Sequence, residues 1–354
     1  MTGGSARSDA LSVSEYAGDA SEWDSFVRRA PGGGVFHRIG WKQVLEDVFG
    51  FAAHYLIARR AGEVAAVLPL FELHAPFMER CLLSVPFAAE AGVCSVDPEA
   101  SRALERAALE RGAARAVRRI ELRDGCDAPG FRFLEGRYYR FRRALHADDD
   151  ANFAALPAKR RNMIRQSLRH GLAVYADASD VAVFHDLYAR TARRFGTPVF
   201  PPRFFHAVLS RFGDDAVLLI VRRGSTPVAG ALAFLFGDTV MPYYVGSHRA
   251  FFRYAINDFL YWQIMRYAVA RGMRVFDFGR SKVGTGAYEF KRLWGCDAEP
   301  LRYRVALMGD ATAIQRSSAD AGIAWMQRVW RRLPLPLTKL LGPFIVSRYG
   351  AYYT

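Results

Sequence analysis

The chain repeats one pattern at an offset of about 160 residues. Residues 56–71 read LIARRAGEVAAVLPLF, and residues 219–236 read LIVRRGSTPVAGALAFLF. Both segments consist of an apolar run, an Arg-Arg pair, a turn containing glycine and a second apolar run, which is the pattern of a β-hairpin. A pattern that recurs at a fixed offset predicts two copies of one structural unit.

Two more correspondences follow the hairpins in the same order. Pro86-Phe87 matches Pro242-Tyr243, and Ile120-Glu121-Leu122 matches Phe276-Asp277-Phe278. Each half therefore reads as a helix, a hairpin, a third strand, a helix and a further strand. Strands that alternate with helices predict an α/β (α+β) architecture with mixed sheets flanked by helices.

The length of 354 residues suits two units of roughly 150 residues each. We expect an N-terminal unit over 1–150 and a C-terminal unit over 151–354, joined by the acidic stretch 147–157. No apolar run approaches the roughly 18 residues that span a bilayer, and no signal-peptide pattern opens the chain. The four cysteines are scattered, without zinc or disulfide spacing. These features predict a cytoplasmic protein.

The formal net charge is +14, and arginine supplies nearly all of the basic excess, because only five residues are lysine. A surface of this kind attracts RNA, anionic lipid headgroups or substrates that carry diphosphate. An arginine-rich composition without any such partner explains the charge equally well.

Apolar periodicity and terminal glycines predict helices over 40–50, 180–196 and 257–272. The proline-rich stretch 197–205 favours a fixed loop. The segment 323–345 combines tryptophans with arginines and prolines, so it either rests on a membrane interface or packs across its domain.

Basic residues gather in the segment 159–172, KRRNMIRQSLRHGL. If this segment is helical, Arg161, Arg165 and Arg169 lie four apart on one stripe, with Lys159 close by. Guanidinium groups bind phosphate through paired hydrogen bonds, so the stripe is a candidate substrate site. A solvated helix face is the alternative.

A second candidate region is formed by PYYVGS (242–247) and VFDFGRSKVGTGAYEFKRLWG (275–295). Tyr243 and Tyr244 alternate on a strand, so one faces the core and the other faces the opposite side. The second segment places glycines beside cations, an arrangement that can hold an anionic group. Its candidate residues are Arg280, Lys282, Gly284, Gly286, Phe290 and Lys291. No phosphate-binding loop, dinucleotide fingerprint, hydrolase elbow or metal-ligand motif is present.

The order of these segments resembles the FemAB-related proteins associated with exosortase/PEP-CTERM gene sets. The resemblance rests on KRRNMIRQSLRHGL, TPVFPPRFF, PYYVGS, NDFLYWQIMRYAVARG, FDFGRSKVGTG and YEFKRLWG, with VFHRIGWKQVLEDVFG, HYLIARRAGEVAAVLPLF and VPF in the first half. It covers roughly residues 22–350. It implies two GNAT-like acyltransferase units in tandem.

FemAB-type enzymes transfer an aminoacyl group from charged tRNA to an amine of a peptidoglycan precursor, and wider relatives use acyl-CoA or carrier-bound donors. The resemblance therefore implies an N-acyltransferase of cell-envelope or exopolysaccharide biosynthesis, with no tightly bound cofactor and no metal. The chain lacks the helical-hairpin insertion that some Fem enzymes place beside tRNA, which argues against a tRNA donor.

The resemblance also assigns roles to individual residues. Phe290 and Lys291 match an F-K pair near the reaction centre, where the lysine stabilises the developing oxyanion. The stripe of Lys159, Arg161 and Arg165 matches a region that contacts substrate phosphates. A carboxylate or a bound water must take the proton of the acceptor amine.

Asp277 is the candidate for that carboxylate, and Asp258 is a weaker one because it also suits a helix cap. The Tyr244 hydroxyl is a candidate for positioning the nucleophile. The alternative to an enzyme is a non-catalytic protein, which either binds RNA or another polyanion or serves as a scaffold at the inner membrane.

Overall fold

The computed structural model describes residues 10–124, 128–309 and 317–352. It divides into two compact units, each described here by itself. Unit 1 comprises Met1–Glu135, Arg302–Ile314 and Ala351–Thr354, and unit 2 comprises Gly136–Leu301 and Gln315–Gly350. Contacts assign segments from both ends of the chain to unit 1, so these units do not correspond to a single division along the sequence. The predicted boundary after residue 150 therefore stays a prediction.

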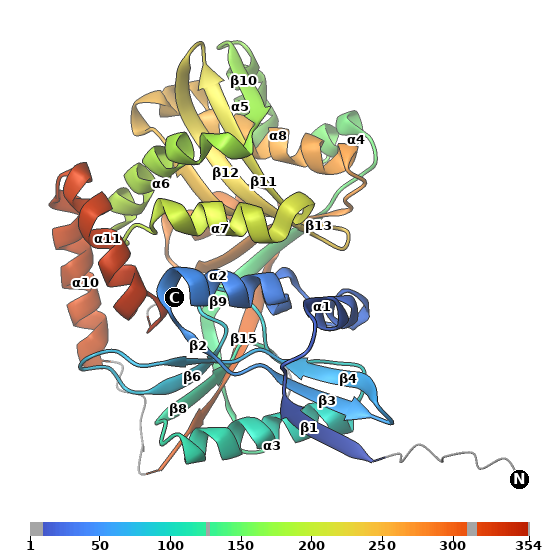
Figure 1. Ribbon diagram of the computed structural model, residues 1–354. Coiled ribbons are helices and arrows are strands. Elements are labelled where there is room, and N and C mark those ends of the chain that lie inside the picture. Colours follow the sequence, from blue (N-terminus) through green and yellow to red (C-terminus); the bar gives the residue numbers. More distant parts are fainter. Residues whose placement is uncertain (1–9, 125–127, 310–316, 353–354) are drawn as a thin grey trace, which may run out of the picture. The chain divides into compact units, whose positions relative to one another are not determined.

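Unit 1 contains two sheets (Figure 1). One has the strand order β1-β3-β4-β7, and the other runs β15-β8-β6-β5-β2 within this unit. The elements are β1 (Leu11–Glu15), α1 (Ala20–Arg29), η1 (Val35–His37), α2 (Ile39–Phe49), β2 (Ala52–Ala53), β3 (Leu56–Arg60), β4 (Glu63–Leu68), β5 (Phe71–Leu73), β6 (Cys81–Ser84), β7 (Cys94–Ser95), α3 (Pro98–Ala114) and β8 (Arg119–Leu122).

Unit 2 is built on a sheet of order β10-β11-β12-β13-β14-β9. Its elements are α4 (Asp149–Ala154), α5 (Ala158–Leu168), β10 (Leu172–Ala176), η2 (Ala178–Asp180), α6 (Val181–Phe195), α7 (Pro202–Phe212), η3 (Gly213–Asp215), β11 (Ala216–Arg223), β12 (Thr226–Phe236), β13 (Thr239–Ser247), η4 (Arg249–Tyr254), α8 (Ile256–Ala270), β14 (Val275–Lys282), α9 (Gly286–Arg292), α10 (Ser317–Arg332) and α11 (Leu335–Tyr349). The segments β9 (Arg132–Ala144), β15 (Ala298–Leu307) and η5 (Gly350–Tyr352) contain the boundaries between the units.

Both predicted hairpins form. Strands β3 and β4 pair antiparallel, as do β11 and β12, and each pair is joined at a turn with glycine at positive φ, Gly62 or Gly224. The predicted helices also end where expected, since Gly50 and Gly196 adopt the left-handed conformation directly after α2 and α6. Glycine is favoured there because a side chain at positive φ collides with the backbone.

The sheet of unit 2 is buried on both faces. Val217 and Leu219 of β11 share an apolar cluster with Leu260 of α8. On the other face, a Cβ on Gly230 would contact Phe184 of α6 at 3.3 Å. Helices on both faces explain why β11 reads as a continuous apolar run rather than an alternating one.

Two predictions of local structure are wrong. The acidic stretch 147–157 is not a linker, because it forms α4 inside unit 2 with Asp148 capping the Ala151 N–H. The stretch 197–205 is a loop only to Pro201, since Pro202 begins α7. Proline suits the first turn of a helix because the amide hydrogen it lacks has no partner there.

Among the described residues, no helix is long and apolar enough to cross a membrane.

Candidate active site

The central strands of unit 2, β13 and β14, start as a parallel pair and then separate. They pair at Thr239 with Val275 and at Val240 with Phe276. Further along, the pairing of β13 with β12 shifts at Tyr243, since Leu232 faces Tyr244 while Ala233 faces Pro242. Such a bulge bends a strand away from its neighbour and redirects its side chains.

The separated strands enclose a cavity of about 660 Å³ that belongs entirely to unit 2. Its walls come from β13, α6, the start of α8 and the segment from β14 to α9, and they include the predicted site residues Tyr243, Tyr244, Gly286, Phe290 and Lys291. Tyr244 is buried and Tyr243 half-buried, and both line this one cavity, so the predicted placement of the two tyrosines on opposite sides of the strand stays a prediction. Most other lining side chains are aromatic or aliphatic, as is usual for a small-molecule site.

Helix α6 is held against the end of β13 at very short range. A Cβ on Gly246 would lie 2.5 Å from the carbonyl carbon of Leu187, so only glycine fits. Next to it, the Ser247 N–H donates to the Thr191 hydroxyl at 2.9 Å. These contacts fix one wall of the cavity, because Thr191 and Ser247 both line it.

Lys291 is a buried lysine on α9, only 9% exposed. Its ammonium group donates to the carbonyl oxygens of Gly279 at 3.1 Å and Arg280 at 2.9 Å. Burial lowers the pKa of Lys291 to about 7, with nearby Asp277 opposing the shift and Arg280 adding to it. The amine is therefore partly neutral near pH 7, and it can accept or donate a proton.

The geometry of β14 explains how two carbonyls come to face this lysine. The pairing of β14 with β9 is interrupted between Asp277 and Arg280, and Gly279 lies there at φ 69°. Asp277 is fully buried and accepts hydrogen bonds from Arg140 at 2.8 Å and from the Gly279 N–H at 2.7 Å. The carboxylate is thus bonded on both oxygens, and Asp277 does not line the cavity.

Two buried polar atoms of cavity-lining residues have no hydrogen-bond partner in the described structure: the Tyr244 hydroxyl and the side-chain amide oxygen (Oδ1) of Asn257. Burial raises the pKa of Tyr244 well above its ordinary value, so its hydroxyl keeps its proton and can donate it. A buried polar group without a partner is costly, and a ligand is one way to satisfy it. The sequence pattern did not single out Asn257, because one asparagine before an apolar helix carries no signal.

Two arginines in the cavity wall, Arg194 and Arg249, also point to an anion. Neither forms an ion pair with a described carboxylate. Burial lowers the pKa of Arg194, and the like charge of Arg249 lowers it further. The Arg194 guanidinium lies against the rings of Phe195 and Phe252, at 4.9 and 4.8 Å. Two cations held together without a counter-ion favour binding of an anionic group.

A smaller hollow of about 360 Å³ shares Phe252, Asn257, Gly286 and Phe290 with the main cavity. It reaches the first turn of α8, which has no side-chain cap. The helix dipole favours negative charge at this end, and two carboxylates already line the hollow there, Asp258 of α8 and Glu289 of α9.

Arg160 lines the same hollow and donates to Asp258 at 2.5 Å, and both residues are buried. Burial raises the pKa of Asp258, although the charge of Arg160 opposes the shift. Asp258 therefore acts as the partner of a buried arginine on α5.

The predicted basic stripe lies on α5 and ends at its cap residue Arg169, and neither the stripe nor Lys159 lines either cavity. Lys159 is exposed. Arg161 donates to the carbonyl oxygens of Ala154 and Leu156. Arg165 stacks over Phe153 at 5.1 Å. Sequence spacing identified the stripe, but the buried Arg160 between its members is the residue that reaches the hollow.

The remaining predicted residues lie around the turn between β14 and α9. Lys282 and Gly284 are exposed, and Gly284 has a φ of 75°. The Arg280 guanidinium lies over the Tyr138 ring at 4.7 Å, while its backbone carbonyl binds Lys291. Gly286 begins α9 and lines the main cavity.

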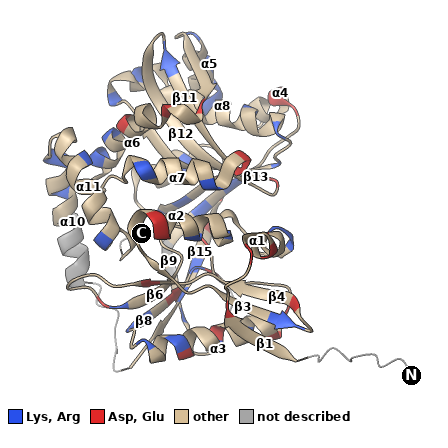
Figure 2. Ribbon diagram, viewed as in Figure 1, with Lys and Arg blue, Asp and Glu red and all other residues tan. Residues whose placement is uncertain are grey.

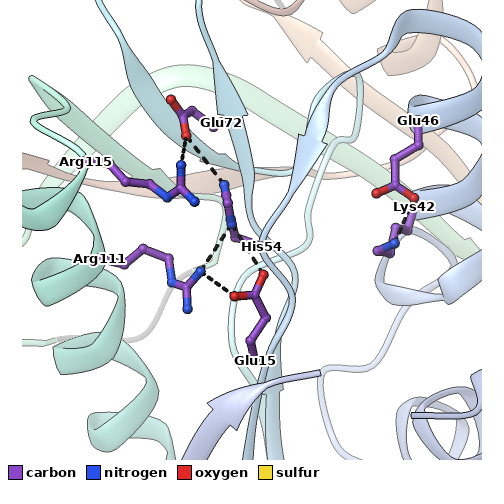
Figure 3. A network of polar contacts seen from close by, with 7 residues as sticks. All are labelled: Glu15, Lys42, Glu46, His54, Glu72, Arg111 and Arg115. Carbon is purple, nitrogen blue, oxygen red and sulfur yellow. Dashed lines mark hydrogen bonds and ion pairs between the residues drawn. The ribbon is translucent and has the colours of Figure 1, made fainter. Parts of the chain in front are cut away.

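Unit 1 contains a separate polar network around His54 (Figure 3). Arg111 of α3 and Arg115, directly after that helix, pair with Glu15 and Glu72, both at 2.7 Å, and His54 lies between the two carboxylates at 3.5 Å from each. Burial lowers the pKa of His54, and the two arginines lower it further. Each arginine has a carboxylate partner, so this network ties α3 to β1 and β5. Within the described residues, no group of His, Cys, Asp or Glu is arranged to hold a metal ion.

Comparison with known proteins identifies the fold. Residues 158–292 match the profile of the acetyltransferase (GNAT) domain. Among solved structures, FemX is similar with a TM-score of 0.66 and 17% identity, over 83% of this chain and 97% of that chain. A tandem GNAT protein from the clavulanic acid biosynthesis pathway matches with a TM-score of 0.53 and 12% identity, over 85% and 99%.

The C-terminal domain of a putative lysylphosphatidylglycerol synthetase from Agrobacterium fabrum matches with a TM-score of 0.53 and 15% identity, over 88% and 95%. A search among curated proteins gave no match. The predicted mixed α/β fold of GNAT type is confirmed, and the matched profile spans the segment from α5 to α9 that builds the cavity.

Proposed function

We propose that the chain is an N-acyltransferase whose reaction takes place in the cavity between β13 and β14. The observation that carries the proposal is Lys291, a buried amine in the wall of that cavity with a pKa of about 7. The GNAT profile over 158–292 and the FemX-like fold support acyl transfer as the reaction class.

In the proposed mechanism the nitrogen of the acceptor amine attacks the carbonyl carbon of the acyl donor. The new C–N bond forms, and the C–S bond of a thioester or the C–O bond of an aminoacyl ester breaks. Neutral Lys291 accepts the proton that the amine loses and later returns it to the leaving sulfur or oxygen. Among the lining residues of the cavity there is no carboxylate that could take this proton, so Asp277 is proposed to position the β14 carbonyls instead.

Oxyanion stabilisation follows from the same geometry. Once protonated, Lys291 keeps two N–H groups on the carbonyls of Gly279 and Arg280 and has a third for the tetrahedral intermediate. The Tyr244 hydroxyl is a second donor in the same cavity without a protein partner. Binding the two substrates next to each other supplies much of the remaining acceleration.

The donor is proposed to be anionic, because Arg194 and Arg249 lie in the cavity wall without a described carboxylate partner. Acyl-CoA, an acyl-carrier protein and aminoacyl-tRNA all carry phosphate. The acceptor is proposed to be an amine of an exopolysaccharide or cell-envelope precursor handled in the cytoplasm, in the PEP-CTERM/exosortase context implied by the sequence resemblance.

Donor binding by the purified chain tests the proposal. Acyl-CoA, aminoacyl-tRNA and uncharged tRNA are compared at two salt concentrations, with Arg194→Gln, Arg249→Gln and the exposed control Arg271→Gln. We expect saturable binding of one acylated donor, weakened about tenfold by either cavity variant and unchanged by the control. Equal, salt-sensitive binding of both RNAs, with the three variants alike, would instead support a polyanion-binding protein without a transfer site.

A further inference from the structure

Helix α11 turns a row of large apolar side chains outward. Leu337, Leu340, Leu341 and Phe344 follow the spacing i, i+3, i+4 and i+7, so they lie on one face. Leu340 is 72% exposed and Phe344 57%. Single exposed leucines are common on protein surfaces, whereas a contiguous apolar row on one helix indicates an interaction site.

The opposite face of α11 explains how this row comes to be exposed. Thr338, Gly342 and Val346 are buried there. A Cβ on Gly342 would lie 2.6 Å from the Val199 nitrogen, so the backbone of the helix approaches this segment directly. Lys339 adds an ion pair with Asp186 of α6 at 2.6 Å. Small residues therefore dock α11 on unit 2, and its larger apolar residues remain outside, the reverse of an ordinary amphipathic surface helix.

Helix α10 extends the apolar surface. Trp325 is 61% exposed and Val329 38%, while Trp330 is buried. The helix is held on unit 2 by a hydrogen bond from Arg331 to the Phe195 carbonyl oxygen at 3.3 Å. We define the outer face of the two helices by Trp325 and Val329 of α10 with Leu337, Leu340, Leu341 and Phe344 of α11.

The charged residues of α10 and α11 after residue 320 are all basic. Residues 321–349 contain no Asp or Glu, and they contain five basic residues: Arg328, Arg331, Arg332, Lys339 and Arg348. Figure 2 shows Lys and Arg, without Asp or Glu, along α11 and the part of α10 that is not grey. Arg348 lies 3.9 Å from the centre of the Phe344 ring, so a cation is attached directly to the apolar row. Apolar side chains bordered by basic ones are the pattern of a helix that lies in a membrane interface.

We propose that the outer face of α10 and α11 docks on a membrane surface rich in anionic lipid. The apolar side chains enter the boundary between headgroups and acyl chains, and the basic side chains bind the lipid phosphates. A second copy of the chain fits this face less well, because a two-fold contact would bring the same basic residues together without acidic partners. The proposal does not depend on the transfer reaction, since it rests on residues outside the cavity.

Docking at this face would place the cavity close to the membrane surface. Helix α6 carries α11 through Asp186, and its Thr191 and Arg194 line the cavity. The reaction site is thereby held one helix away from the lipid surface, a suitable position for an acceptor amine attached to a lipid.

Tryptophan fluorescence offers a direct test, because all six tryptophans lie in the described residues and Trp325 alone is exposed, the others being at most 6% exposed. The full-length protein is mixed with neutral phosphatidylcholine vesicles or with vesicles that also contain about a third phosphatidylglycerol, each with and without brominated acyl chains. We expect quenching only by the anionic brominated vesicles, and we expect Trp325→Phe to abolish most of it. Flotation of the same mixtures measures the bound fraction.

Matched variants distinguish membrane binding through this face from nonspecific binding by any exposed apolar residue. Leu340→Ser/Phe344→Ser should reduce binding to anionic vesicles at least about tenfold, because two inserted side chains are lost. The control is Leu168→Ser, which removes a leucine that is 55% exposed on α5, and it should bind like the wild type. Raising the salt concentration should weaken binding.

Three results would overturn the proposal. The first is a wild type that binds neither vesicle at low salt. The second is vesicle binding that the double variant retains. The third is a concentration-dependent dimer that the double variant abolishes, which would make this face a contact between copies.

Discussion

Units 1 and 2 both contain a parallel strand pair that follows a hairpin. Within the described residues, the pair of unit 1 stays hydrogen-bonded along its length, whereas the pair of unit 2 separates around a cavity lined by Lys291. In unit 1, β6 and β8 pair over four consecutive positions, from Cys81 with Arg119 to Ser84 with Leu122. In unit 2, β13 and β14 pair at two positions and then diverge. The same order of elements can therefore produce either a closed or an open pair of strands.

The difference is concentrated at one position of the repeat. Glu121 corresponds to Asp277, and two residues further on Arg123 corresponds to Gly279. Arg123 is 1% exposed and donates to the carbonyl oxygens of Val85 at 3.3 Å and Ala88 at 2.6 Å, which holds the ends of β6 and β8 together. Gly279 has no side chain and lies at positive φ, so the backbone turns and Lys291 binds its carbonyl. A buried arginine thus closes one unit, while a glycine leaves the other open.

The largest effect on stability is expected for Arg123→Met. The substitution removes the donor of the buried Ala88 carbonyl and one of the two donors of the Val85 carbonyl, and it leaves Glu121 without Arg123, so we expect a loss of about 3–5 kcal/mol in the free energy of unfolding. Urea unfolding measures the loss. Transfer activity per folded molecule should stay within about twofold of the wild type. A selective loss of activity in the folded variant would place unit 1 in the reaction.

Gly246→Val tests whether the close contact of α6 with β13 builds the cavity wall. The new side chain must displace backbone atoms of Leu187, so we expect a loss of about 2–3 kcal/mol in stability together with loss of donor binding. Gly286→Ala is the control for stability, since a Cβ there meets open space. Unfolding curves and donor titrations of both variants decide the matter, and a Gly246→Val protein with normal binding would contradict the proposed wall.

Gly279→Ala tests whether the turn in β14 positions the side chain of Lys291. Alanine at this positive φ should cost about 1–2 kcal/mol in stability and shift the carbonyl that holds Lys291, which should lower turnover at least about tenfold. Gly272→Ala is matched in φ, at 74°, and its Cβ would meet open space after α8. We expect it to lose similar stability and keep full turnover. Equal turnover in the two variants would show that β14 does not position Lys291.

The smallest effect is expected for the basic stripe on α5. Arg165→Gln removes an exposed side chain, so stability should change by less than about 0.5 kcal/mol. Donor binding should weaken about two- to fivefold at low salt and recover towards the wild-type value at high salt if the stripe attracts substrate phosphates. An unchanged affinity at low salt would leave the stripe as a solvated helix face.

The sequence predicted the parts of this molecule that depend on local patterns. The hairpins and the helix ends at Gly50 and Gly196 follow from periodicity and from the conformational freedom of glycine. Lys291 could be proposed from the family resemblance and Tyr244 from its place at the end of a strand, but the burial of both depends on chain segments far away in the sequence.

Other features depend on contacts between segments that are far apart in the sequence. Arg160, rather than its neighbours, turns towards Asp258 of α8, and Asp277 is bonded to Arg140 from another strand, a contact that no local spacing reveals. Helix α4 is an exception, because its cap is local: Asp148 accepts from the Ala151 N–H three residues later, and the acidic composition of the stretch was interpreted as a linker instead.

The pH dependence of transfer tests the central claim most directly. Between pH 5 and 9, kcat/KM of the wild type should rise with pH and level off above about 7, because the fraction of neutral Lys291 rises through that pKa. Lys291→Met should lower kcat about 100- to 1000-fold, lose this rise and keep its donor affinity. As a check on the pKa itself, the folded state binds fewer protons than the unfolded state between about 7 and 10.5, so stability relative to Lys291→Met should increase by about 1.4 kcal/mol per pH unit there. A Lys291→Met protein that retains wild-type turnover and the same pH profile would contradict the account.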